Sequence, residues 1–110
     1  MNFLEDSKSE DRQIRRKVVD NLNCPPEILE SLASDKVYKI RASVALHPKT
    51  PQHILLNLSE DKMDTVRRNV ADNSSTPTRV IRKLSKDPNE TVREYASRAL
   101  QKRIDDLWNW

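Results

Sequence analysis

The sequence contains no glycine in 110 residues, although average usage would supply about eight. Phosphate-binding loops of the Walker, dinucleotide and kinase types all depend on glycine, so these nucleotide sites are excluded. The Asn-Gly and Asp-Gly turns that most often close β-hairpins are excluded for the same reason. The missing glycine therefore favours an all-helical chain.

Cysteine, aromatic residues and long apolar runs are also scarce. The single cysteine, Cys24, has no second thiol with which to form a disulfide or a thiolate metal cluster, and we expect no cofactor. Mean hydropathy is −0.84, and no stretch is apolar enough to span a bilayer. Residues 1–11 carry four acidic groups and do not resemble an export signal. We therefore expect a cytoplasmic, single-domain protein.

The remaining sequence repeats itself every 26 residues, which is typical of stacked helical units. Hydrophobic–arginine pairs, prolines and aspartates all keep this interval: Ile14-Arg15, Ile40-Arg41, Val66-Arg67 and Val92-Arg93; Pro25, Pro51 and Pro77; Asp35, Asp61 and Asp87. The units cover about residues 11–35, 36–61 and 62–87, with a C-terminal capping unit at 88–110. Seven or more positions share this register without an insertion, so chance does not explain it.

Each unit predicts two helices. The first has apolar residues at helical spacing, an aspartate as its predicted N-cap (Asp35, Asp61, Asp87), and Asn21, His47 or Asn73 as its predicted left-handed C-cap. The run Asp87-Pro88-Asn89-Glu90 predicts proline at the first helical position. The second helix is predicted to span eight to ten residues, partly 3₁₀, and to begin at Cys24-Pro25, Thr50-Pro51 and Thr76-Pro77, where a threonine hydroxyl would cap it.

Two such short helices cannot bury their own apolar faces, whereas stacked copies can share one core. We therefore predict an all-α fold, a short right-handed α-solenoid of about four two-helix units. Residues 89–106 contain no break and predict one longer helix that caps the C-terminal end. We expect Phe3 and Leu4 to cover the other end.

The repeated pattern resembles a known family, the leucine-rich repeat variant, and one run is similar to the related HEAT repeat. The first resemblance rests on Val44-Ala45, His47-Pro48-x-Thr50-Pro51 and Ile54-Leu55-x-x-Leu58-Ser59-x-Asp61, and the second on Asp87-Pro88-x-x-x-Val92-Arg93. Together they cover about residues 11–100. The resemblance implies a scaffold that holds other proteins along an exposed helical face, and in a minority of relatives a basic concave surface that binds DNA.

The arginines that repeat, Arg15, Arg41, Arg67 and Arg93, allow two interpretations. They could form a row that faces phosphates or carboxylates of a ligand. Alternatively, they could form an inter-repeat ladder in which an aspartate pairs with the arginine six residues after it, as in Asp35–Arg41, Asp61–Arg67 and Asp87–Arg93, because guanidinium and carboxylate groups form strong bidentate pairs. The second interpretation is favoured because the acid repeats together with the arginine.

Charged residues that do not repeat are better candidates for partner binding, although a solvated basic face is the favoured explanation for them. The candidates are Arg16, Lys17, Arg68, Arg79, Arg82 and Lys83. The tryptophans Trp108 and Trp110 are predicted either to plug the terminal core or to form an exposed anchor. His47 shares its position with asparagines and Cys24 shares its position with threonines, so neither indicates a catalytic or metal site.

The sequence is compatible with three kinds of function. A non-catalytic scaffold for a protein partner is preferred, because no catalytic constellation falls outside the repeat. Binding of a nucleic-acid duplex is the alternative, because residues 12–110 carry a net charge of +6, whereas residues 1–11 carry −3. We do not expect an enzyme. We expect a monomer, or a weak dimer joined through the C-terminal helix, since a short stack has a small core.

Overall fold

The computed structural model describes residues 1–109, which form eight α-helices and no strand. The all-α prediction is therefore confirmed. The helices are α1 (Phe3–Ser7), α2 (Arg12–Asp20), α3 (Pro26–Leu32), α4 (Tyr38–Leu46), α5 (Gln52–Leu58), α6 (Asp64–Asp72), α7 (Thr78–Leu84) and α8 (Glu90–Trp108).

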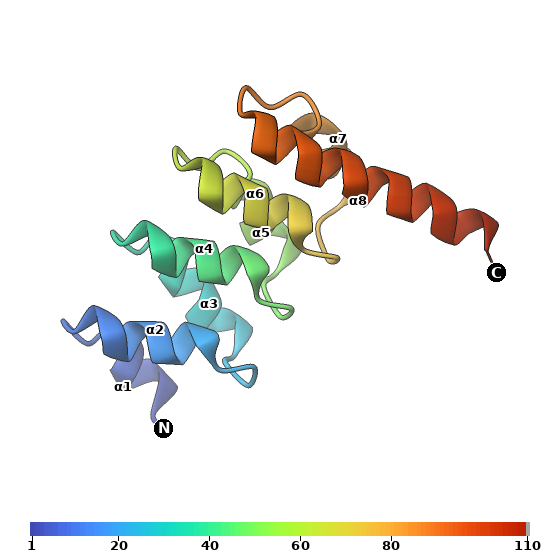
Figure 1. The fold of residues 1–110 in the computed structure, drawn as a ribbon. Coiled ribbons are helices and arrows are strands. Elements are labelled where there is room, and N and C mark those ends of the chain that lie inside the picture. Colours follow the sequence, from blue (N-terminus) through green and yellow to red (C-terminus); the bar gives the residue numbers. More distant parts are fainter. Residues whose placement is uncertain (110) are drawn as a thin grey trace.

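The helices form two layers (Figure 1). The front layer contains α2, α4, α6 and α8, and each of these helices packs against the next one in the row. The back layer contains α1, α3, α5 and α7, which lie behind the front helices (Figure 1). The chain measures 44 × 32 × 19 Å along its principal axes.

The core lies between the layers and is built from the same positions in successive units. In the front layer these positions are filled by Val18, Val44, Val70 and Ala96, all of them fully buried. In the back layer they are filled by Leu29, Leu55 and Ile81, which are equally buried. The seven-residue helices of the back layer are too short to be stable alone, so their burial against both neighbours is what stabilises them. These helices are α-helical throughout, so the prediction of partly 3₁₀ structure is wrong.

The predicted N-caps are wrong by two residues. The helices α4, α6 and α8 begin three residues after the repeated aspartates, and their N-cap residues are Val37, Met63 and Asn89. Each aspartate instead accepts a hydrogen bond from the amide two residues later, such as Val37 N–H to Asp35 Oδ1 at 2.9 Å. Pro88 consequently precedes the helix instead of starting it.

The predicted left-handed C-caps are also wrong. Asn21, His47 and Asn73 have φ values of −80°, −65° and −84° and extended backbone, and no residue in the described part of the chain has a positive φ. At the ends of α2, α4 and α6 the chain therefore continues in an extended conformation and does not form the left-handed turn that usually requires glycine. This explains how the fold forms with no glycine at all.

The two ends of the stack differ. The helix α8 continues for 19 residues without a break, which confirms the single long C-terminal helix. At the other end Phe3 packs against the core, but Leu4 is 58% exposed, so only half of the predicted N-terminal cover is present.

Candidate binding surface

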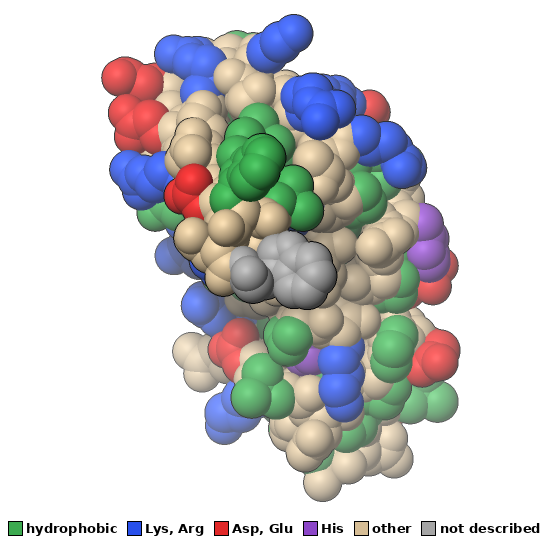
Figure 2. Space-filling model, turned by 90° about the vertical axis from the view of Figure 1, so that its right-hand side faces the viewer, with side chains coloured by type: hydrophobic (Ala, Val, Ile, Leu, Met, Phe, Trp, Pro, Cys, Tyr) green, Lys and Arg blue, Asp and Glu red, His purple; other side chains and the backbone are tan. Residues whose placement is uncertain are grey.

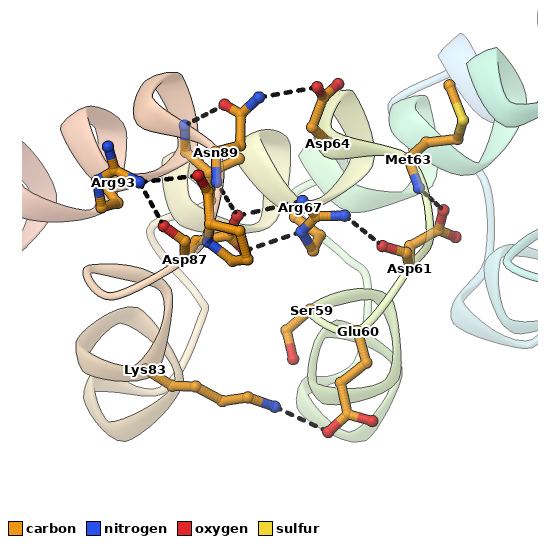
Figure 3. Close-up of polar contacts among 12 residues, drawn as sticks. Ser59, Glu60, Asp61, Met63, Asp64, Arg67, Lys83, Asp87, Asn89 and Arg93 are labelled. Carbon is orange, nitrogen blue, oxygen red and sulfur yellow. Dashed lines mark hydrogen bonds and ion pairs between the residues drawn. The ribbon is translucent and has the colours of Figure 1, made fainter.

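The repeated arginines form a closed ladder that links each unit to the next. Arg41 donates from Nε and Nη2 to the two carboxylate oxygens of Asp61, at 2.8 and 3.1 Å. The pairs Arg15–Asp35 and Arg67–Asp87 repeat this geometry, and Figure 3 shows the latter. The carboxylate thus lies 20 residues after its arginine. The predicted partner six residues before it contributes only a backbone carbonyl, as in Arg41 Nη1 to Asp35 O at 2.8 Å.

Burial makes this ladder structural. The side chains of Arg41 and Asp61 are each about one-tenth exposed, so the pair is shielded from solvent. Burial alone would raise the pKa of the Asp61 carboxyl, but the hydrogen bonds from Arg41 and the Met63 amide, with the Arg41 charge, lower that pKa below its ordinary value. The three closed arginines therefore have no free edge for a phosphate, and this interpretation of the row is wrong for them.

A second ladder of buried polar side chains runs along the ends of the front helices. Asn73 donates from Nδ2 to the carbonyl oxygens of Ala45 at 2.8 Å and His47 at 3.1 Å, both in the preceding unit. His47 places its Nε2 2.9 Å from the carbonyl oxygen of Asn21 in the same manner. The sequence signal for this ladder is the shared position of these residues in the repeat, which by itself predicts helix capping only.

The threonines at the start of the back helices also serve the helix before them. Thr50 donates its hydroxyl to the Val44 carbonyl at 2.6 Å, and Thr76 donates to Val70 at 2.7 Å. Neither caps the helix that follows, whose N-cap is proline. In both cases the hydroxyl adds a second hydrogen bond to a carbonyl at the end of a front helix, which also accepts the amide of the C-cap residue.

The structure distributes the predicted partner-binding residues over three separate places. Arg16 and Lys17 are exposed on α2, where Arg16 lies 3.6 Å from Asp20. Arg79 and Arg82 are exposed on α7 in the back layer, beside Lys83. Lys83 is engaged with Glu60 of α5 at 2.8 Å (Figure 3). Arg68 lies on α6 in the front layer and is half-buried.

The two predicted tryptophans do not plug the core. Trp108 is 82% exposed at the end of α8, which contradicts that interpretation for this residue. Trp110 lies outside the described residues. The exposed-anchor interpretation of Trp108 stays open.

The most organised exposed group lies between α6 and α8, around Tyr95. The guanidinium carbons of Arg68 and Arg98 lie 5.5 and 5.4 Å from the centre of the Tyr95 ring. Arg68 Nε is buried without a hydrogen-bond partner among the described residues. Stacking on an aromatic ring holds a guanidinium in place. Each edge is partly engaged within the chain, because Arg68 Nη2 donates to Asn69 Oδ1 at 3.4 Å and Arg98 Nη2 lies 3.8 Å from Glu94 Oε2, and the remaining N–H groups can donate to a ligand. Sequence reasoning selected Arg68 but missed Arg98, whose only signal was its helical spacing of three from Tyr95.

A crevice of about 380 Å³ adjoins this stack. Arg103 closes one side by donating to the Thr78 hydroxyl at 2.9 Å and to the Ser74 carbonyl at 3.3 Å. The lining combines basic, acidic and apolar groups: Ala71, Asp72, Asn73, Ser74, Tyr95, Arg98, Ala99, Lys102, Arg103 and Asp106. We call this crevice together with Arg68 the Tyr95 surface.

The Tyr95 surface is suited to recognition. Its guanidinium and ammonium groups can bind carboxylates, and Tyr95 and Ala99 provide an apolar wall. Figure 2 shows that basic, acidic and hydrophobic side chains are interspersed on the face at the C-terminal end of α8. Within residues 1–109, no three His, Cys, Asp or Glu side chains gather as a metal site.

Neither a membrane-spanning helix nor a similar known protein indicates what the Tyr95 surface binds. Among the described helices, none has the length and apolar character needed to cross a bilayer. Comparison with family models, curated proteins and solved structures finds no match for the chain.

Proposed function

We propose that the chain is a short right-handed α-solenoid, similar to the leucine-rich repeat variant and HEAT repeats, and that it acts as a non-catalytic scaffold for a protein partner. The solenoid is supported by the regular step from each front helix to the next and by the two ladders, which bond one unit to its neighbour. A scaffold of this kind keeps its repeated side chains for stacking and uses the others for recognition.

The observation that carries the function is the Tyr95 surface. Arg68 and Arg98 are both held against one tyrosine ring beside an open crevice. Tyrosine and arginine are among the residues most enriched at binding hot spots, and arginines already held in place lose little side-chain entropy on binding. The partner segment that fits carries a carboxylate for the guanidinium edges and an apolar side chain for the crevice.

Duplex nucleic acid is the second candidate, favoured by the net charge of +6 on residues 12–110. A backbone binder requires basic groups along one continuous surface. Here Arg16 lies on α2 and Arg79 lies on α7 in the other layer, and Asp72 and Asp106 line the crevice. This arrangement supports a protein partner more than a duplex.

The test is selection of a displayed peptide library on the wild-type chain, with counter-selection on Arg68→Ala/Arg98→Ala. We expect enriched peptides with an acidic residue next to an apolar one. The double variant should bind them about 100-fold more weakly, because two arginine contacts are removed. The matched control is Arg79→Ala/Arg82→Ala, which removes the same charge from the back layer. Circular dichroism checks that both variants are folded.

Two results would contradict the proposal. One is a set of peptides that both double variants bind as well as the wild type does. The other is tight binding of a DNA duplex, measured by fluorescence anisotropy, that falls steeply with salt and requires Arg79 and Arg82; that result would favour the nucleic-acid alternative.

A further inference from the structure

The N-terminal end of the front layer exposes a position that is buried in every other unit. Ile14 of α2 is 37% exposed, whereas Ile40, Val66 and Val92, which follow it at intervals of 26 residues, are at most 1% exposed. In those units the preceding front helix covers the side chain. Within the described residues no front helix precedes α2, so Ile14 lies on an open stacking face.

The opposite end of the front layer presents the outer side of α8. The residues of α8 that face the crevice next to α6 include Tyr95, Ala99 and Arg103. At 3.6 residues per turn, the opposite side of α8 carries one continuous stripe, consisting of Arg93, Ser97, Gln101, Ile104 and Trp108. We call this stripe the α8 outer face. Its apolar members Ile104 and Trp108 are both exposed.

Arg93 marks this end as an open end of the arginine ladder. Its Nη1 donates to the carbonyl oxygens of Asp87 at 2.8 Å and Pro88 at 2.9 Å (Figure 3), so its guanidinium is anchored as in the other units. In those units Nε and Nη2 then bind the aspartate of the next unit. For Arg93 no such carboxylate is present among residues 1–109, and this edge remains available.

We propose that copies of the chain stack head to tail, with the α8 outer face of one copy packed against α2 of the next. The contact repeats the step from α6 to α8 once more, so Ile14 becomes covered as its three equivalents are. The ladder sets this orientation, because an arginine edge without a carboxylate lies at the α8 end, whereas the α2 end presents the position that an aspartate fills in the other units.

The same step identifies the residues that meet. The ladder position that faces Arg93 is Ser9 of the next copy, which accepts the Asp11 amide at 3.1 Å much as Asp35 accepts the Val37 amide. Ser9 has no charge, so the ladder contact between the two copies is weaker than the contacts within one copy. Glu10 provides the nearest carboxylate. The exposed Leu22, in the loop after α2, lies where the outer end of the neighbouring α8 passes.

Such a contact joins two different surfaces and therefore does not close on itself. In sedimentation equilibrium over a concentration series, the mass of the wild type should rise from 12.8 kDa without a plateau at the dimer. Ile14→Glu and Ile104→Glu each destroy one end and leave the other intact. Each variant alone should remain at 12.8 kDa, and an equimolar mixture should form a 1:1 dimer and nothing larger. Both positions are exposed, so both variants should fold.

A gain-of-function variant tests the ladder itself. Ser9→Asp supplies the missing carboxylate and should tighten association about tenfold, since bonds between charged groups are among the stronger ones. Adding Arg93→Gln to Ser9→Asp should remove the gain. Three results would overturn the proposal: a wild type that stays at 12.8 kDa over the whole series, a dimer plateau that Ile14→Glu retains, or no effect of Ser9→Asp. A retained dimer would indicate contact between two α8 helices.

Discussion

Replacement of Arg41 by alanine tests the middle one of the three closed pairs of the ladder. The variant removes two hydrogen bonds to Asp61 and one to the Asp35 carbonyl. It leaves the Asp61 carboxylate in place, about one-tenth exposed and without its cation. The perturbation therefore creates an unpaired buried charge as well as removing contacts.

The expected loss is about 3 kcal/mol of the free energy of unfolding. Removal of one partner from a buried ion pair costs about 3–5 kcal/mol in other proteins. The lower end applies here because Asp61 keeps the hydrogen bond from the Met63 amide at 2.9 Å. With a total stability of about 5–15 kcal/mol for a domain, the variant stays folded at 25 °C but is much less stable.

The assay is urea unfolding followed by circular dichroism. With a slope of about 1.5 kcal/mol per molar urea, the midpoint should fall by about 2 M. The matched control is the double variant Arg41→Met/Asp61→Leu, which removes both charges and fills their volume. Because no charge is left unpaired, this variant should lie within about 1 kcal/mol of the wild type.

Two outcomes would refute this reasoning. If Arg41→Ala shifts stability by less than about 0.5 kcal/mol, the pair behaves as an exposed surface pair and the ladder does not join the units. If the double variant is as unstable as Arg41→Ala, the unpaired carboxylate is not the cause, and the loss comes from hydrogen bonds that both variants lack, such as that from Arg41 Nη1 to the Asp35 carbonyl.

Three further predictions concern the other buried polar groups. The carboxyl pKa values of Asp61 and Asp87 are lowered in the folded protein, so the contribution of these carboxylates to stability is complete above the ordinary aspartate pKa of about 3.9. Tm measured from pH 5 to pH 2 should therefore fall as the pH drops below that value. Asn73→Asp turns a donor to two carbonyls into an acceptor and should cost about 2 kcal/mol in urea unfolding, whereas Asn21→Asp, whose side-chain oxygen accepts only the Asn23 amide, should be nearly neutral. Burial raises the pKa of the Cys24 thiol, and the nearby charge of Lys49 opposes this effect only in part. A disulfide reagent should therefore modify Cys24 only at the rate of unfolding. Fast modification in native buffer would contradict this prediction.

Much of the fold could be predicted because the repeat determines helix position and burial together. The interval of 26 residues places helix starts at residues 12, 38, 64 and 90 in the front layer and at 26, 52 and 78 in the back layer. The apolar residues that share this interval, such as Val44 and Leu55, are the buried ones. Helical spacing and the need to cover each apolar face were sufficient for this level of detail.

The bonds between units could not be predicted, because a repeat does not reveal which copy of a residue is the partner. Asp35 lies six residues before Arg41 and 20 residues after Arg15, and each spacing occurs three times in the chain. Only the stacking geometry selects the second pairing, with Nε of Arg15 2.8 Å from Asp35. The same ambiguity concealed the role of Asn73, whose partners belong to the preceding unit.

One position shows why the candidate site lies where the repeat varies. The same position of the repeat is occupied by Arg16, Ala42, Arg68 and Glu94 in successive units. Ala42 is small and buried, and Asn69 of the next helix donates to its carbonyl at 2.9 Å, so α4 and α6 come into close contact there. Arg68 instead meets Tyr95, which replaces Asn69 one unit later, and is held against the ring. Two differences between repeat units thus replace a buried helix contact with a half-buried arginine–tyrosine stack, and under the proposed function this departure from the repeat is where a partner binds.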